Sequence, residues 1–593
     1  MFNKKNSYLK NHLNNISKLL SYFWKKDINA RSKYAIFFIV TFFMILLNII
    51  FPLILKEIVM LLSVDNSKFS VKVFTYVFLY GLIWLAGQFF SIIRELTLLT
   101  VIEKMVSFLC VKVLNHIHNL PYNFHVNKKI GEVISYIDKA YQALPNIFWG
   151  FLLNIIPTII EIFIATFIIW YLYGYLFGII FILTLIFFMI FSIMFSESIS
   201  HAQSISNKRH FITNSFIVDS LLNFSLVKYF GNSNLENNKV KNLLDKREYA
   251  AVYAQKIACY MKFGQVIIIF LCISLITYIT VKEVLCGQLY ISDLVLINSY
   301  ILQFANPLFL FGYIFKEMRK GFTDLDSIFN LLKLNSQQNL LSQGLQEKSF
   351  NSCTIEFKNV SFSFNKNINV LDNLSFKLKP NKVIAIVGSS GAGKSTISNL
   401  LFRFYTPISG EILINGNNIS NLHNNVITKL ISIMPQNLNL FNNTIRYNLC
   451  YGNSDATSEE INNILNVTQL SNMVNNLPLG LDTLIGENGL TLSSGEKQRI
   501  ALARALLKKS PVYIFDEATS HLDYLTEKAI NQTLKTLIKN ASLLIIAHRL
   551  STIQFADHII VLSKGHIIEE GTHTELLNSK GYYFKLWQSQ KNK

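Results

Sequence analysis

The chain has 593 residues, which is too long for a single domain, and its formal net charge at pH 7 is +19. This charge suits nucleic acid, an anionic membrane surface or an anionic cargo, but a hydrophobic content of 51% favours the membrane. The six cysteines show no paired or metal-ligand spacing, which argues against a disulfide framework or a zinc module.

The first 33 residues form a polar segment with eight basic residues and one acidic residue. The segment is rich in Lys and Asn rather than Arg and Ser, and it has no small-residue cleavage site, so it is a poor transit or signal peptide. We expect residues 1–33 to lie in the cytosol as an anchor ahead of the first membrane span.

Apolar runs behind this segment, uncharged except for Glu161, are long enough to cross a bilayer as six helices. These runs cover residues 34–55, 73–93, 140–196 (two spans), 263–281 and 294–315. The polar and aromatic sequence at 170–174 predicts a very short turn between the third and fourth spans. The pattern predicts an α-helical six-span transmembrane domain at 34–333.

Basic residues are distributed unevenly between the segments that join the spans. With a cytosolic N-terminus, the inner segments 1–33, 94–142 and 196–262 hold 23 Lys and Arg residues, and the outer segments hold 4. This asymmetry follows the positive-inside rule and argues against a role in binding nucleic acid. The two large inner segments should continue the spans as helices and turn near 121–124 and 227–232, where Pro and Gly interrupt the pattern.

Glu161 is the one acidic residue deep inside a predicted span. Intramembrane carboxylates are costly and usually face a cavity or a partner. Two interpretations are open at this point. The carboxyl group contacts cargo or a gate, or it is protonated or locally paired and holds helices together.

A linker at 334–352 and a soluble domain at 353–593 follow the spans. In this domain an apolar strand at 383–387 leads into a glycine-rich loop and a helix, a setting that binds phosphate through backbone N–H groups. Lys394 would reach the β- and γ-phosphates, and the Ser395 hydroxyl would bind Mg²⁺. The loop consists of Gly388, Ser389, Ser390, Gly391, Ala392, Gly393, Lys394, Ser395 and Thr396.

Two further stretches point to nucleotide chemistry. An apolar strand ends at Asp516, which would approach Mg²⁺, and the next residue, Glu517, would polarise an attacking water. A turn of small residues that opens a helix offers a second set of N–H groups for an anion. This turn contains Ser493, Ser494, Gly495 and Glu496. The domain is therefore expected to have an α/β P-loop fold.

This set of motifs resembles the ATP-binding cassette transporters, and with six spans ahead of the cassette the chain is similar to an exporter half-transporter. The resemblance implies that Phe364 stacks on adenine and that Gln436 binds Mg²⁺ and takes part in coupling. It also implies that Asp523 lies in a loop that crosses a dimer interface and that His548 contacts the γ-phosphate. Residues 483–489 would touch the cytosolic ends of the spans.

The same resemblance implies a homodimer in a lipid bilayer, with each ATP and its Mg²⁺ between the phosphate loop of one copy and the signature Leu492–Gln498 of the other. ATP binding would close the cassettes, and hydrolysis would reset them. The family signature usually reads Ser-Gly-Gly, whereas this chain has Ser493, Ser494 and Gly495. Because Ser494 adds a Cβ where close approach to phosphate favours glycine, we expect slower but retained ATP hydrolysis.

Several strings in the membrane half resemble the Atm-type exporters, which are linked to glutathione–sulfur compounds, iron–sulfur assembly and heavy-metal tolerance. The strings lie at 120–132, 154–161, 218–223, 227–232, 263–265 and 293–298. The resemblance implies a thiol-conjugate cargo, with Glu161, Lys262 and Gln265 as candidate contacts. Lys262 would supply one positive charge to a carboxylate or snorkel at the membrane edge. An Arg-rich stretch typical of the subfamily is missing, because residues 174–207 contain no Lys or Arg.

Two other functions on this scaffold stay open. One is a general exporter of lipids or hydrophobic drugs, and the other is an ATP-gated channel or regulator, against which Glu517 and His548 argue. The expected location is a bacterial inner membrane, with a mitochondrial or mitochondrion-derived inner membrane as the alternative.

Overall fold

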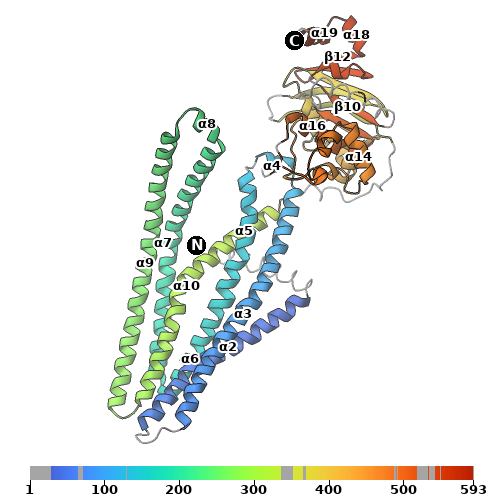
Figure 1. The fold of residues 1–593 in the computed structure, drawn as a ribbon. Helices are drawn as coiled ribbons and strands as arrows, with labels where there is room; N and C mark the ends of the chain where they lie inside the picture. The colour runs from blue at the N-terminus through green and yellow to red at the C-terminus, as the bar shows by residue number, and fades with distance from the viewer. Residues whose placement is uncertain are drawn as a thin grey trace. The chain divides into compact units, whose positions relative to one another are not determined.

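The structure is a computed structural model that describes residues 28–64, 71–127, 130–334, 352–364, 369–486, 489–490, 492–516, 532, 541–547 and 549–591. The chain divides into two compact units, which we call the helical unit (Met1–His118 with Lys129–Leu334) and the cassette unit (Asn119–Lys128 with Asn335–Lys593). The helical unit holds the long apolar helices, and the cassette unit holds the sheets (Figure 1). Most of the predicted N-terminal segment and linker lies outside the described residues.

The helical unit confirms the six predicted spans, because six of its described helical stretches are long and apolar enough to cross a bilayer. At 1.5 Å per residue, the 48 residues of α7 extend over roughly 70 Å, which is more than twice the thickness of a hydrocarbon core. The excess length provides the predicted helical extensions. The helices are α2 (Ile28–Val64), α3 (Val71–His118), α5 (Ile130–Phe148), α6 (Ile156–Tyr173), α7 (Tyr175–Leu222), α8 (Phe224–Tyr229), α9 (Ser233–Leu285) and α10 (Ile291–Leu332).

The predicted short turn between the third and fourth spans is a single residue, Gly174. Its φ of 89° lies in the left-handed region that favours glycine, and its N–H donates to the carbonyl of Trp170. This one backbone conformation ends α6 and lets α7 begin at the next residue.

The two predicted cytosolic turns each contain a short helix, α4 (Tyr122–Asn127) in one and α8 in the other. α8 ends in a Schellman motif, because Gly231 adopts a φ of 63° and its N–H donates to the Lys228 carbonyl, while the Asn232 N–H donates to the Val227 carbonyl. α7 and α9 lie side by side as a hairpin with α8 at its tip (Figure 1). The chain therefore reverses through two sharp corners rather than one loop.

A π-helical segment, η1 (Trp149–Ile155), joins α5 to α6 and was not predicted from the sequence. Pro157 follows it closely, and proline has no N–H to donate to the preceding helical turn. The side chain of Asn154 donates to the Trp149 carbonyl over 2.8 Å, which satisfies one backbone acceptor in the widened turn. The side-chain bond and the proline both lie at this local change of helix type.

An ion pair connects the ends of three membrane helices on the side predicted to face outward. Lys56 on α2 lies 2.8 Å from the carboxylate of Asp293 on α10. The hydroxyl of Tyr173, at the end of α6, donates to the same carboxylate over 2.8 Å. The backbone N–H of Tyr290 also donates to Asp293, which caps α10. One carboxylate therefore holds α2, α6 and the start of α10 together.

The cassette unit contains two main sheets. The first has the order β12-β11-β3-β10-β9-β6 and is parallel except for β12, and the second is antiparallel with the order β2-β1-β4-β5. The strands are β1 (Ile355–Phe362), β2 (Leu371–Leu378), β3 (Val383–Gly388), β4 (Ser409–Ile414), β5 (Asn417–Asn418), β6 (Ile431–Met434), β7 (Asn443–Thr444), β8 (Leu484–Ile485), β9 (Val512–Asp516), β10 (Ser542–Ile546), β11 (His558–Ser563) and β12 (His566–Gly571). The strands predicted before the phosphate loop and before Glu517 are therefore confirmed as β3 and β9.

Helices cover both faces of the six-stranded sheet. Ile384 and Ile386 of β3 pack into one apolar core with the antiparallel sheet and α11, whereas Val383, Ala385 and Val387 pack into another with α16, η5 and α19. Burial on both faces explains why β3 is a continuous apolar run. The helices that the structure describes in this unit besides α4 are α11 (Lys394–Leu401), η3 (Ile419–Asn421), α12 (Asn424–Leu430), α13 (Ile445–Cys450), α14 (Ser458–Val467), α15 (Ser471–Asn475), η4 (Gly480–Asp482), α16 (Ser494–Leu507), η5 (Leu550–Ile553), α18 (His573–Asn578) and α19 (Tyr582–Lys591).

Candidate functional site

The carboxyl ends of the parallel strands lie at one edge of the six-stranded sheet, and the predicted site residues follow these ends. β3 ends at Gly388, β9 ends at Asp516, and β6 ends two residues before Gln436. Ile386 of β3 and Asp516 of β9 both pair with Ile546 of the intervening β10. Two strand spacings, about 10 Å, therefore separate Asp516 from the strand that leads into the phosphate loop. This is the edge at which open α/β sheets bind ligands.

Three glycines determine the path of the phosphate loop. Gly391 and Gly393 have φ values of 80° and 98°, which side chains disfavour. A Cβ on Gly388 would lie 2.2 Å from the Leu562 carbonyl oxygen, and one on Gly393 would lie 2.8 Å from the Val370 carbonyl oxygen. Backbone conformation and close packing therefore require glycine at these positions.

The helix after the loop, α11, begins at Lys394, three residues earlier than the sequence predicts, because the left-handed Gly393 acts as its N-cap. The Lys394 ammonium donates to the Gly388 and Ser389 carbonyls over 2.8 and 2.9 Å. The lysine charge and the positive end of α11 are thereby held together at the loop, an arrangement that attracts phosphate. Ser395 lies in the first turn of the same helix.

The residues predicted to bind Mg²⁺ and to stack on adenine differ in their exposure to solvent. Asp516 is 4% exposed, whereas Gln436 lies on the surface. Phe364 follows β1 and is 54% exposed, which leaves area for a planar ligand. Asp516 and Gln436 thus belong to strand ends at the same sheet edge as the phosphate loop, and Phe364 belongs to the neighbouring antiparallel sheet region.

The predicted signature turn opens α16 with a capping box. The Ser493 hydroxyl oxygen accepts the Glu496 N–H, and the Glu496 carboxylate accepts both the N–H and the hydroxyl of Ser493 over 2.8 Å. Ser494 is the first helical residue and is exposed. The Ser-x-x-Glu spacing is itself a sequence signal for this cap, and our sequence reasoning did not use it. The cap keeps the first-turn N–H groups of α16 in place.

Three predicted residues, Glu517, Asp523 and His548, lie outside the described residues, as do positions 487–488 of the predicted 483–489 segment. β9 ends one residue before Glu517, and β10 ends two residues before His548. Within the described part of 483–489, β8 pairs with β7.

Comparisons with known proteins cover both units. Residues 34–308 match the ABC transporter transmembrane region, and residues 371–520 match the ABC transporter family model. The proteins named "Iron-sulfur clusters transporter ABCB7, mitochondrial" of Oryzias latipes and Homo sapiens are each 33% identical over 98% of this chain and 79% of their own length. A solved bacterial Atm1-family ABC exporter with ATP bound is 31% identical, with a TM-score of 0.86, over 95% of this chain and 99% of that one. The chain belongs to the Atm1 family of ABC exporters.

Membership of the Atm1 family confirms the predicted family, the predicted fold and the predicted enzyme. The cassette unit binds ATP and hydrolyses it in a cycle coupled to transport, and the chain is a multi-pass membrane protein. The relatives include mitochondrial proteins and a bacterial exporter, which are the two locations that the sequence predicts.

Glu161 of this Atm1-family chain is buried and paired. It is 7% exposed, and its carboxylate accepts a hydrogen bond from the Asn48 amide over 2.9 Å, which joins α6 to α2. The Gln303 amide on α10 donates to the backbone carbonyl of Asn48 over 3.2 Å. Glu161 thus joins α6 to α2, and Asn48 extends the contact to α10, which favours the interpretation that Glu161 holds helices together.

The other two cargo candidates lie in different environments. Gln265 is fully buried, and its amide donates to the Ser192 hydroxyl over 2.8 Å, which links α9 to α7. Lys262, three residues away, is exposed. The structure therefore does not bring Glu161, Lys262 and Gln265 together around one described pocket.

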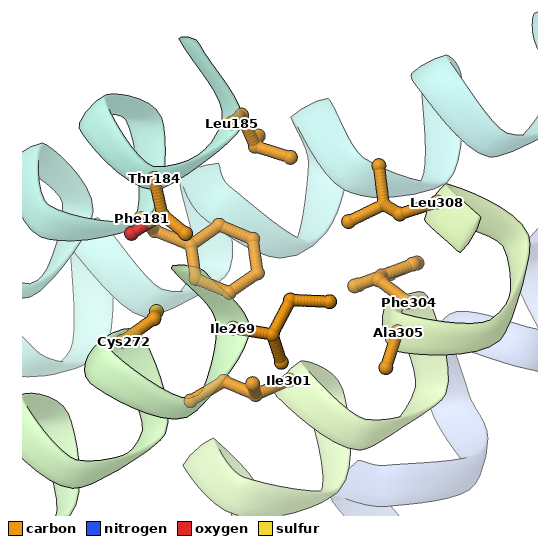
Figure 2. Close-up of a pocket in the computed structure, with 9 residues that line it drawn as sticks. All are labelled: Phe181, Thr184, Leu185, Ile269, Cys272, Ile301, Phe304, Ala305 and Leu308. Atoms are coloured by element: carbon orange, nitrogen blue, oxygen red, sulfur yellow. The ribbon is translucent and has the colours of Figure 1, made fainter. Parts of the chain in front are cut away.

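A small apolar pocket lies between α7, α9 and α10, and side chains from the three helices point into it (Figure 2). Its volume of about 20 Å³ has room for roughly one water molecule. None of the nine lining residues is charged, and none is a predicted cargo contact. The lining consists of Phe181, Thr184, Leu185, Ile269, Cys272, Ile301, Phe304, Ala305 and Leu308.

Proposed function

We propose that two copies of this chain form the exporter and that the cargo is a glutathione- or sulfur-containing compound, such as an iron–sulfur-related species or a metal conjugate. The observation that carries the proposal is the similarity to proteins named iron–sulfur clusters transporters over 98% of this chain. The similarity includes the membrane half, which is the part of an exporter that must hold cargo.

Two phosphate-directed elements in each cassette unit support the proposed dimer. The phosphate loop with Lys394 would hold the β- and γ-phosphates of ATP in its own chain. The capped start of α16, at Ser493, would direct its N–H groups at the ATP of the second copy. Each nucleotide would then have an anion-binding element on either side, and neither copy would complete the site alone.

The oxygen donors at the sheet edge fit Mg²⁺. The Ser395 hydroxyl, the Gln436 amide oxygen and the buried Asp516 carboxylate are ligand types that Mg²⁺ prefers. Bound with ATP, Mg²⁺ neutralises negative charge on the phosphates. Glu517 would orient the attacking water, and His548 would contact the γ-phosphate. Phe364, with its exposed ring, would stack on adenine.

One observation favours a second candidate function, the export of lipids or hydrophobic drugs. The stretch 174–207 contains no Lys or Arg that would attract the carboxylates of glutathione.

An ATPase and uptake assay in liposomes tests both functions. The purified chain is given oxidised glutathione, glutathione–metal adducts, hydrophobic drugs and lipids, and the Lys394→Ala variant provides the inactive control. Stimulation and uptake of thiol conjugates support the main proposal. Stimulation by drugs or lipids alone would replace it with the second candidate.

A further inference from the structure

A chain of aromatic rings connects helix α4 to Phe364 inside the cassette unit. Tyr122 on α4 stacks on Phe404, with ring centres 4.4 Å apart and an interplanar angle of 8°. Tyr122 also meets Tyr405 edge to face at 5.6 Å and 80°. Tyr405 then meets Phe364 edge to face at 5.2 Å and 85°. These are the separations and geometries at which aromatic rings attract each other.

The backbone after α11 determines where Phe404 and Tyr405 lie. Arg403 adopts a φ of 54°, and its N–H donates to the Leu400 carbonyl, while the Phe404 N–H donates to the Asn399 carbonyl. These bonds form a Schellman motif with an arginine in the position that usually holds glycine. A left-handed arginine costs about 1–2 kcal/mol, so the surrounding fold must stabilise the turn. The helix that begins at the phosphate loop thus ends at the aromatic chain.

Among the described residues, Phe364 has two aromatic neighbours of different kinds. Phe362 lies in β1, is 4% exposed, and meets the Phe364 ring at 5.0 Å, so it forms a fixed support. Tyr405 is the second support and is itself contacted by Tyr122 of α4. Burial and the neighbouring Tyr122 raise the pKa of Tyr405, so its phenol is neutral at physiological pH. The orientation of the Phe364 ring therefore depends on one residue of the sheet and one residue that α4 contacts.

We propose that Tyr405 is a positioning residue for the base platform Phe364, and that through Tyr122 it couples base stacking to the position of α4. The inference rests on the proposed role of Phe364 in stacking on adenine. Because Tyr122 of α4 packs against Tyr405, a shift of α4 would change the support that Tyr405 gives to the Phe364 ring. Linkage requires the reverse as well, so a stacked base stabilises one arrangement of α4.

A ligand that lacks a nucleobase distinguishes a role of Tyr405 in base stacking from a general effect on protein stability. Inorganic tripolyphosphate with Mg²⁺ offers the phosphate chain of ATP but nothing to stack. The full-length protein in lipid nanodiscs is titrated with MgATP, and Mg-tripolyphosphate is measured as a competitor. We expect Tyr405→Ala to weaken ATP binding about two- to tenfold, the range of an aromatic pair, and to leave tripolyphosphate binding unchanged. Tyr405→Phe keeps the ring and should restore ATP binding.

Two further measurements complete the test. Phe376→Leu is the matched control, because Phe376 stacks on Phe357 in the same antiparallel sheet at 4.5 Å and should not change the ratio of the two affinities. Tyr122→Ala should weaken ATP binding in the wild-type background and have a smaller effect in Phe364→Ala. Such a non-additive pair measures the coupling directly.

The outcomes distinguish the inference from the proposed function. If Phe364→Ala lowers ATP affinity selectively and Tyr405→Ala does not, the inference is wrong and the base platform stands. Additive effects of Tyr122→Ala and Phe364→Ala overturn the coupling to α4. If Phe364→Ala itself leaves the affinity ratio unchanged, the proposed stacking role fails and the inference fails with it.

Discussion

The phosphate loop allows a comparison of the same substitution at two glycines. Gly391 and Gly393 both have left-handed backbones, with φ values of 80° and 98°. A Cβ on Gly391 would meet no described atom within 4 Å, whereas one on Gly393 would lie 2.7 Å from Leu371 and 2.8 Å from the Val370 carbonyl oxygen. Alanine therefore adds only backbone strain at Gly391, and strain plus a clash with backbone at Gly393.

The backbone strain determines how large a loss of MgATP affinity we expect. A left-handed alanine costs about 1–2 kcal/mol. We expect the loop to relax out of this conformation when ATP is absent and to adopt it when ATP is bound, so the strain energy lowers the affinity for ATP. We expect Gly391→Ala to weaken MgATP binding about five- to thirtyfold by this strain alone. In Gly393→Ala the neighbouring strand β2 must also move, so binding should fall by a larger factor than in Gly391→Ala. The start of α11 and the position of Lys394 should change as well.

Titration of both full-length variants with MgATP in nanodiscs measures the two effects, and circular dichroism with thermal unfolding checks that each variant is folded. Equal losses of affinity in the two variants would show that the contact with Val370 is irrelevant. A Gly393→Ala variant with wild-type affinity would refute the geometric reasoning about the loop.

Three further predictions concern catalysis and stability. Glu517→Gln should retain ATP binding and abolish sustained hydrolysis, and normal steady-state turnover in a phosphate-release assay would contradict its assigned role. Ser494→Gly should raise kcat severalfold with little change in KM, because in the proposed dimer it would remove a side chain beside the phosphate of the second copy's ATP; an unchanged or lower kcat would count against this. Asp293→Asn should destabilise the helical unit by about 2 kcal/mol, because it removes the charge that Lys56 and Tyr173 share. We expect a lower denaturation midpoint in detergent. Lys56→Met should reduce the stability of the Asp293→Asn variant by less than it reduces the stability of the wild type. Additive losses of stability would refute the pairing.

Patterns that depend on local sequence predicted the elements well. Long apolar runs predicted the six spans, since a bilayer requires about 20 apolar residues per helix. The apolar strand before Gly388 and the glycines after it predicted a phosphate loop, since only glycine adopts its backbone conformations readily. The Atm1-family resemblance in short strings of the membrane half was likewise confirmed over nearly the whole length. Each of these signals is contained in adjacent residues.

Contacts between distant residues could not be predicted in this way. Nothing in the sequence near Glu161 indicates that Asn48, 113 positions earlier, donates a hydrogen bond to it. Nothing in the sequence near Gln265 indicates that its amide donates to Ser192 on α7, 73 positions earlier. The aromatic path from Tyr122 to Phe364 joins segments more than 200 residues apart.

By itself the sequence determined the membrane helices, the phosphate loop, the α/β cassette and the family, because these depend on hydrophobic length, backbone freedom and short motifs. Only the tertiary structure decided which polar groups in the membrane satisfy each other, and that α4 reaches the aromatic residues beside Phe364. The physical reason is that buried polar groups and rings take whichever partner the packing of distant helices brings within a few ångströms, and no local pattern encodes that choice.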